Sequence, residues 1–186
     1  MNRIVLYAGL VTTLFATNGC GLLDSATTTP STGGNFTASI SGGTGANNDK
    51  SDFTATTVDG SWTASGGGGI LTVTTIAVPL TSANTQSITI NLGSPTKLAV
   101  GEVFTVGASQ NGAAAYAVVT YAETNGSDNS KTKGWAGMTG TAKIDSISGK
   151  TIGVSISGVA MNHSAGPATG TFNLSGSGSI TSVGGL

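Results

Sequence analysis

The sequence predicts an all-β domain, and three observations support that prediction. Several segments alternate between apolar and polar residues, which is the pattern of a half-buried β-strand. These segments are rich in Val, Ile and Thr, whose branched side chains suit a pleated surface. Residues typical of turns separate them. About nine short strands joined by short turns favour an antiparallel β-sandwich, Ig-like or jelly-roll-like, or a partly closed barrel.

The clearest strands are expected at 87–92, 151–156 and 171–175, where one face is apolar and the other is small or polar. Weaker alternation predicts further strands at 70–78, 102–106, 115–121 and 138–147. The predicted core consists of the large apolar residues of these and neighbouring segments: Phe53, Trp62, Leu71, Val73, Ile88, Ile90, Leu92, Phe104, Tyr116, Val118, Ile144, Ile152, Val154, Ile156, Phe172 and Leu174.

Turn residues lie between the predicted strands. Asp59-Gly60 predicts a two-residue hairpin turn, because both residues tolerate a positive φ. Proline cannot donate a ladder hydrogen bond, so a strand is expected to end at Gly93-Ser94-Pro95. A tight reversal is predicted at 148–150, and a polar loop at 125–129.

The first twenty residues have the composition of an export signal. Arg3 precedes an uncharged apolar run at 4–16, which is shorter than the roughly 20 apolar residues that a spanning helix needs. A basic start, a short apolar centre and small residues at the end are typical of a cleaved signal. The segment closes with Gly19-Cys20, and Cys20 is the only cysteine in the chain.

Residues 14–20, Leu-Phe-Ala-Thr-Asn-Gly-Cys, resemble the lipobox of bacterial lipoproteins, although Thr17 stands where that family prefers leucine. The resemblance implies that Cys20 is lipidated and becomes the acylated amino terminus. A lone cysteine cannot form an internal disulfide, and several acyl chains anchor a protein firmly. The alternatives are a plain secretory signal and an uncleaved anchor. Gly21, where inner-membrane lipoproteins of the enterobacterial type carry aspartate, implies the outer membrane of a bacterial cell envelope.

The chain therefore divides into three predicted parts. Residues 1–19 are the signal peptide, which is expected to be helical and cleaved. Residues 20–35 are the lipidated N-terminus and a flexible linker rich in Thr, Ser, Gly and Pro. Residues 36–186 are a single β domain, large enough to fold without a disulfide or a metal.

Short motifs in this domain are similar to uncharacterised β domains of bacterial lipoproteins. They are Val-Asp-Gly-Ser-Trp at 58–62, Gly-Glu-Val-Phe at 101–104, Gly-Thr-Ala-Lys-Ile-Asp at 140–145 and Gly-Thr-Phe at 170–172. The similarity implies an all-β envelope protein without implying an activity.

Residues suited to catalysis or metal binding are few. His163 is the only histidine in the chain and is expected in a loop. One histidine and one cysteine cannot form a His/Cys zinc site. A Ser-His-Asp triad would have to use His163. Asp49, Asp52 and Asp128 are weak candidates for calcium, because they lie close to asparagines. A glycoside hydrolase would need two of the remaining carboxylates, Asp59, Glu102, Glu123 and Asp145. We predict no catalytic residue, no cofactor and no metal site, and hence no enzyme.

The charged and aromatic residues limit which partners can be expected. Only 8% of the residues are charged and no stretch is strongly basic, which argues against nucleic acid. Trp135 and Tyr121 are candidate ligand-binding residues, because an aromatic ring offers a sugar an apolar face; for Trp135, packing in the core and exposure at the surface are both open. We expect a non-catalytic binding or structural module, held at the membrane through Cys20, whose other partner is a glycan or an envelope protein. The alternatives are a subunit that assembles by lending the tail 176–186 as a strand, and a carbohydrate-active hydrolase.

Overall fold

A computed structural model describes residues 33–44, 52–77, 84–107, 114–125 and 128–186, and every structural statement below concerns these residues. They form β-strands and one short 3-10 turn, η2 (Asn129–Lys131), and include no α-helix. The all-β prediction is therefore confirmed. The predicted signal peptide and Cys20 lie outside the described residues.

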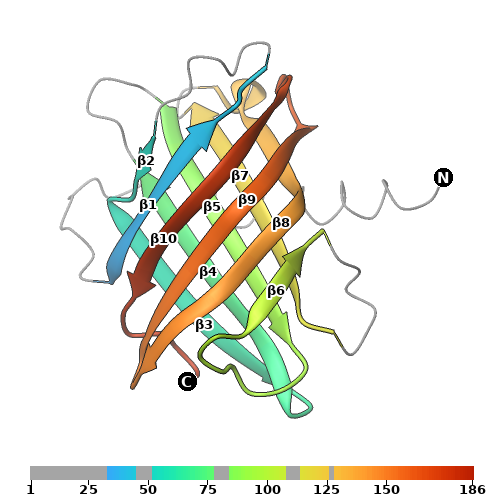
Figure 1. The fold of residues 1–186 in the computed structure, drawn as a ribbon. Coiled ribbons are helices and arrows are strands. Elements are labelled where there is room, and N and C mark those ends of the chain that lie inside the picture. Colours follow the sequence, from blue (N-terminus) through green and yellow to red (C-terminus); the bar gives the residue numbers. More distant parts are fainter. Residues whose placement is uncertain (1–32, 45–51, 78–83, 108–113, 126–127) are drawn as a thin grey trace.

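Ten strands form one sheet (Figure 1). In chain order they are β1 (Gly34–Ser41), β2 (Phe53–Thr54), β3 (Thr57–Ser65), β4 (Gly68–Ala77), β5 (Asn84–Ser94), β6 (Val103–Val106), β7 (Tyr116–Asn125), β8 (Lys133–Ser148), β9 (Thr151–Ala165) and β10 (Thr171–Ile180). Their order across the sheet is β2-β1-β10-β9-β8-β6-β7-β5-β4-β3, with an additional pairing between β8 and β7. The pairing of β6 with β7 is parallel, so the sheet is mixed rather than purely antiparallel.

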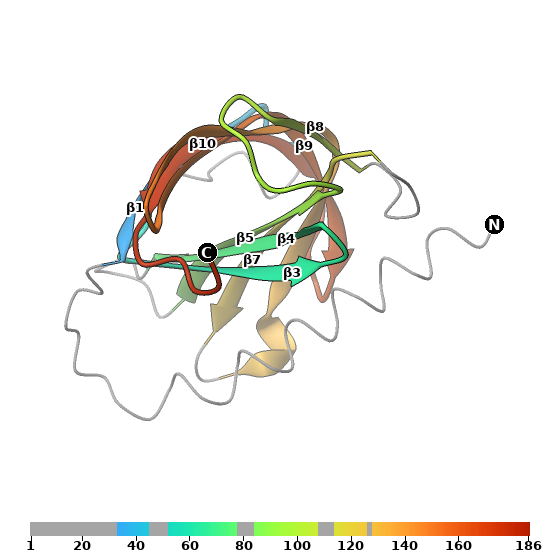
Figure 2. The same cartoon turned by 90° about the horizontal axis from the view of Figure 1, so that it is seen from below.

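The sheet curls into a half-barrel around its core. Figure 2 shows β1, β10, β9 and β8 arching over a flatter layer that contains β7, β5, β4 and β3. A single curled sheet corresponds to the partly closed barrel of the prediction, rather than to a sandwich of two separate sheets.

The two edge strands, β2 and β3, are consecutive in the sequence. β2 pairs with β1 on one edge, and β3 pairs with β4 on the other. Only residues 55 and 56 separate them, and the Ala55 N–H donates a hydrogen bond to the Phe36 carbonyl oxygen at 2.8 Å. This short crossing brings the two edges of the curled sheet together.

The core lies on the concave face, where alternate strand residues point inward. Most of the predicted core residues are buried there, and Trp62 is partly buried and packs against them. The placement of Tyr116 and Val118 in the core is wrong, because both are only half-buried. β7 instead turns Val119 and Tyr121 inward. This strand has apolar residues at successive positions, so alternation could not choose its face; pairing of Val119 with the buried Ile90 does.

One of the predicted turns is also wrong. Asp59 and Gly60 lie inside β3, and the chain reverses at Gly66-Gly67, where φ is +57° and +97°. Gly60 serves packing instead, since an added Cβ would come within 2.6 Å of Cγ2 of Ile180. The predicted reversal at 148–150 is confirmed, with Gly149 at φ +57°. So is the end of a strand at Ser94.

Irregular pairing is concentrated in β8, β9 and β10. The register of β8 with β9 shifts between Gly134 and Trp135, Gly137 and Thr139, Thr139 and Thr141, and Ile144 and Ser146; that of β10 with β9 shifts between Leu174 and Gly176. The register of β3 with β4, β4 with β5 and β5 with β7 runs without a shift. Bulges bend a strand and increase its twist, so they account for the arch in this part of the sheet.

Candidate functional site

The two predicted ligand-binding residues lie side by side. Tyr121 on β7 and Trp135 on β8 are directly opposite each other in the sheet, and their ring centroids are 5.6 Å apart. Phe172 from β10 completes an aromatic cluster, with its ring centroid 5.4 Å from Tyr121 and 5.6 Å from Trp135. Tilted and edge-to-face rings at these distances attract one another.

Of the two alternatives for Trp135, packing in the core is the one observed, because only 1% of the residue is accessible. The residues around Trp135 do not alternate between apolar and polar, so the sequence does not indicate which face of β8 is buried. Pairing with Tyr121 places Trp135 on the face that points toward the core. Tyr121 and Trp135 therefore do not form an open platform on the surface. Their role in ligand binding stays a prediction. Because both side chains are buried, a ligand at the surface would contact the residues that cover them rather than the two rings.

Three polar residues continue the same face toward one end of the half-barrel. Gln86 on β5, Glu123 on β7 and Lys133 on β8 lie directly opposite one another across the three strands. Glu123 and Lys133 are each two residues from an aromatic residue of the cluster, so alternation puts them on the same face of the sheet. We call Gln86, Glu123 and Lys133 the polar end. Sequence reasoning missed this group, although the spacing Tyr121-x-Glu123 and Lys133-x-Trp135 was visible.

Glu123 links the polar end to the aromatic cluster. The Tyr121 hydroxyl donates a hydrogen bond to Oε1 of Glu123 at 3.1 Å, and Nζ of Lys133 lies 3.8 Å from Oε2. The Glu123 side chain is 15% exposed and that of Lys133 is 42% exposed, so a ligand could reach both.

The Tyr121 hydroxyl remains protonated in this arrangement. Burial raises its pKa far above the usual value, and the charge and hydrogen bond of Glu123 raise it further. The neutral hydroxyl thus acts as a fixed donor that orients the Glu123 carboxylate. The polar end offers one carboxylate, one ammonium group and one amide, which is a set suited to hydrogen-bonding a polar ligand.

A second candidate lies on the outer face of β2, β1 and β10. There a shallow open groove of about 550 Å³ runs along a row of hydroxyl groups from Thr37, Ser39, Thr54, Ser175 and Ser177. Asp52 lies at its rim, and its Oδ1 accepts a hydrogen bond from the Ile40 N–H at 3.3 Å. The groove lacks an exposed aromatic ring, since Phe53 beneath it is buried.

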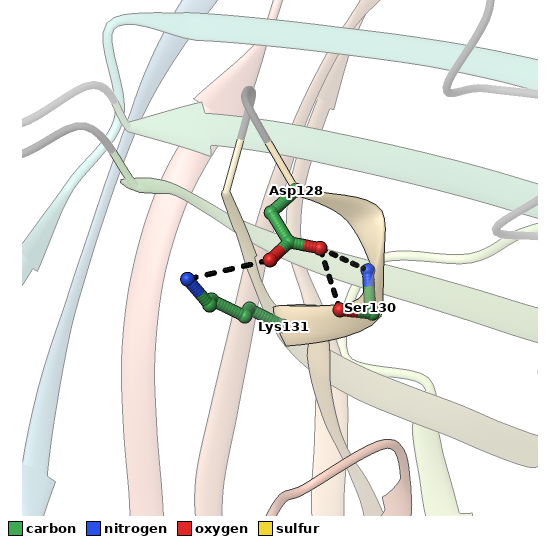
Figure 3. Close-up of polar contacts among 3 residues, drawn as sticks. All are labelled: Asp128, Ser130 and Lys131. Carbon is green, nitrogen blue, oxygen red and sulfur yellow. Dashed lines mark hydrogen bonds and ion pairs between the residues drawn. The ribbon is translucent and has the colours of Figure 1, made fainter.

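Asp128 is occupied within its own turn (Figure 3). Its Oδ1 accepts hydrogen bonds from the Ser130 N–H at 3.0 Å and the Ser130 hydroxyl at 2.5 Å, while Nζ of Lys131 lies 3.3 Å from Oδ2. These bonds, chiefly that from the Ser130 hydroxyl, lower the pKa of the Asp128 carboxyl. The side chain caps η2, and in the described part of the chain no group of three potential ligands forms a metal site.

Two of the carboxylates considered for hydrolysis, Glu102 and Asp145, are engaged in separate contacts. Both oxygens of Glu102 hold the loop before β6, accepting hydrogen bonds from the Ser94 hydroxyl at 2.6 Å and the Ala99 N–H at 3.2 Å. Asp145 pairs with Lys143 at 3.4 Å. The placement of His163 in a loop is wrong, since it lies exposed within β9.

Comparison with protein-family models, curated protein sequences and solved structures finds no match for this chain. The similarity to β domains of bacterial lipoproteins thus stays a prediction. The described residues contain no helix with the length and hydrophobicity of a membrane span.

Proposed function

We propose that this chain is a lipid-anchored protein of the bacterial cell envelope, in the outer membrane, and that its β domain is a non-catalytic binding module. The observation that carries the proposal is the sequence from Met1 to Cys20: a basic start, a short apolar run and a lone cysteine after glycine. Lipidation of Cys20 would give this otherwise unpaired thiol a function.

The geometry of β1 determines where such an anchor would be attached to the domain. β1 begins at Gly34, opposite Ile180, and ends at Ser41, opposite Asn173. The polar end lies at the other end of the strands from Gly34, because Lys133 begins β8 while Ile180 pairs with Ile152 near the start of β9. A tether that enters at Gly34 would therefore attach at the end of the half-barrel opposite the polar end, and would leave the polar end uncovered.

Metabolic labelling tests the anchor. Cells that express the full chain should incorporate radiolabelled palmitate into it, and Cys20→Ser should abolish the label. A wild-type chain without label, or a label that persists in Cys20→Ser, would contradict the proposal.

Binding at the polar end has its own test. The lipidated chain in detergent is screened on an array of bacterial envelope glycans, and any binding should fall at least tenfold in Lys133→Ala and in Glu123→Gln. Lys143→Ala is the matched control, since Lys143 is also a half-exposed β8 lysine paired with a carboxylate. Equal losses in Lys133→Ala and Lys143→Ala would show that the polar end is not the binding site.

A further inference from the structure

The two edges of the sheet are protected by different means. On the β1 edge, β2 pairs with Thr37 and Ala38, and farther along the Asp52 carboxylate accepts the Ile40 N–H. A carboxylate at that position repels the carbonyl oxygens of an incoming strand, which is a common way to block edge pairing. Along β3, the only charged side chain is Asp59, which points away from the core.

The edge of β3 is instead covered by the end of the chain. We call residues 181–186 the C-terminal strap; Figure 1 places the C-terminus beside β3. Gly184 forms a parallel bridge with Ser61: its N–H donates to the Gly60 carbonyl oxygen at 3.2 Å, and its carbonyl oxygen accepts from the Trp62 N–H at 2.7 Å.

One apolar side chain fixes the strap in place. Val183 is fully buried, and its N–H donates to the Lys150 carbonyl oxygen at 2.9 Å. Gly60 lies beside it: an added Cβ there would make an ordinary contact at 3.4 Å with Cγ2 of Val183, but would come within 2.6 Å of Cγ2 of Ile180. The acceptor thus recognises an extended segment with one aliphatic residue followed by a small one.

The strap is joined to β10 through a strained residue. Ser182 has a φ of +58° and is the only non-glycine residue with a positive φ in the described part of the chain. An L-residue pays for this conformation, so an extended continuation of β10 would relieve Ser182. Short hinges under strain favour exchange of a terminal segment between copies.

We propose that the edge of β3 is a strand-acceptor site with an exchangeable occupant, so that residues 182–186 of a second copy replace the chain's own. The remainder of the predicted donor tail cannot take part without dismantling the sheet, because residues 176–180 pair with β1 and β9. The strap has no charged side chain that would oppose a second copy. This inference does not depend on the lipid anchor or on ligand binding.

Hinge variants test the exchange by light scattering on the full chain in detergent. Ser182→Pro cannot adopt a positive φ, so it should open the hinge and convert most of the chain to a dimer. Ser182→Gly adopts this φ without strain and should lower the dimer fraction roughly fivefold or more. A folded Ser182→Pro that stays monomeric at all concentrations would overturn the proposal.

Cross-linking provides a second test that does not alter the hinge. Two single-cysteine chains, Ser61→Cys and Gly184→Cys, are made with Cys20→Ser and mixed under oxidising conditions. Bridged positions lie close enough for a disulfide, and an added Cβ at Gly184 meets no atom within 4 Å. Exchange should give the mixed 61–184 dimer in an amount that rises with concentration. The control pairs Ser61→Cys with Ser39→Cys; a mixed 61–184 yield no greater than this control would refute exchange.

Discussion

The regular and the arched halves of the sheet enclose the core by different means. In the regular half, β3, β4, β5 and β7 pair without a register shift, and inward residues such as Val73 and Ile90 fill the core. In the arched half, β8, β9 and β10 have repeated shifts, and glycines such as Gly140 and Gly158 take positive φ within the strands. Pairing in an unbroken register builds the first half, whereas the second half depends on backbone positions that only glycine fills easily.

The largest fully buried side chain lies where the two halves meet. Trp135 of β8 is directly opposite Tyr121 of the regular half, and its ring packs against the Tyr121 ring. The aromatic cluster is thus the place where the two halves of the sheet contact each other through bulky side chains.

Removal of the Trp135 ring should have the largest effect. Trp135→Ala should lower the free energy of unfolding by about 3–5 kcal/mol, because the side chain is buried and the cavity cannot collapse fully. Chemical denaturation measures this change. Trp62→Ala is the control in the regular half and should cost less, since Trp62 is only partly buried. Equal costs would remove the distinction between the two sites.

Replacing a glycine of the arched half by alanine should cause the next largest loss in the free energy of unfolding. An added Cβ at Gly140 would lie 2.7 Å from Cα of Val159, and Gly140 has a φ of +119°. Strain and overpacking together predict a loss of about 2–5 kcal/mol for Gly140→Ala. At Gly158 the φ is +57° but no atom lies within 4 Å of an added Cβ, so Gly158→Ala should cost only about 1–2 kcal/mol. The reverse order would show that backbone contact does not control the arch.

The face of β7 can be tested with two adjacent valines. Val119→Ala should lower the free energy of unfolding by about 2 kcal/mol, because Val119 is fully buried in the regular half. Val118→Ala should change it by less than about 0.5 kcal/mol, as expected for a residue outside the core. If thermal unfolding shows the larger loss for Val118→Ala, the register of β7 with β5 is wrong.

A smaller effect should appear at alkaline pH. The pKa of Tyr121 is raised in the folded state, so above about pH 10, where tyrosine ionises in the unfolded chain, stability should fall as pH rises. The slope attributable to this residue approaches ~1.4 kcal/mol per pH unit. Tyr121→Phe should remove that part of the slope in denaturation curves measured between pH 8 and about 11. An unchanged slope would indicate that Tyr121 ionises while folded.

The smallest effect is expected at Asp128, which lies outside both halves. Its pKa is lowered in the folded state, so the stabilisation it supplies is present above the unfolded pKa near 3.9 and is lost as pH falls. Asp128→Asn should therefore leave stability nearly unchanged at pH 2 and lower it slightly at pH 7. If wild type and Asp128→Asn differed more in stability at pH 2 than at pH 7, the predicted direction of the pH dependence would be wrong.

The prediction from sequence succeeded where one face of a strand is uniformly apolar. Residues 87–92 and 151–156 alternate, and both lie in strands with their aliphatic side chains buried. The strand at 115–121 was predicted, but the prediction of its buried face was wrong, because apolar residues occupy both faces and only pairing with β5 decides between them.

The candidate site was predicted less well than the fold. Tyr121 and Trp135 were singled out, but the sequence around Trp135 has no local signal that pairing with Tyr121 would bury it. Asp59-Gly60 suggested a turn because its composition allows one; the need for space beside Ile180 explains the glycine instead. Lys133 and Gln86 join Glu123 only through long-range pairing, which alternation within one strand does not indicate.

The pairing of β1 with β10 has a consequence for the order of folding. Gly34 and Ile180 are neighbours in the sheet although most of the chain lies between them, and contacts so distant in sequence form slowly. During synthesis the β3-β4 and β4-β5 hairpins can assemble early, but β1 must wait until β10 has emerged. The curled sheet therefore stays open between β1 and β9 until β10 has been synthesised.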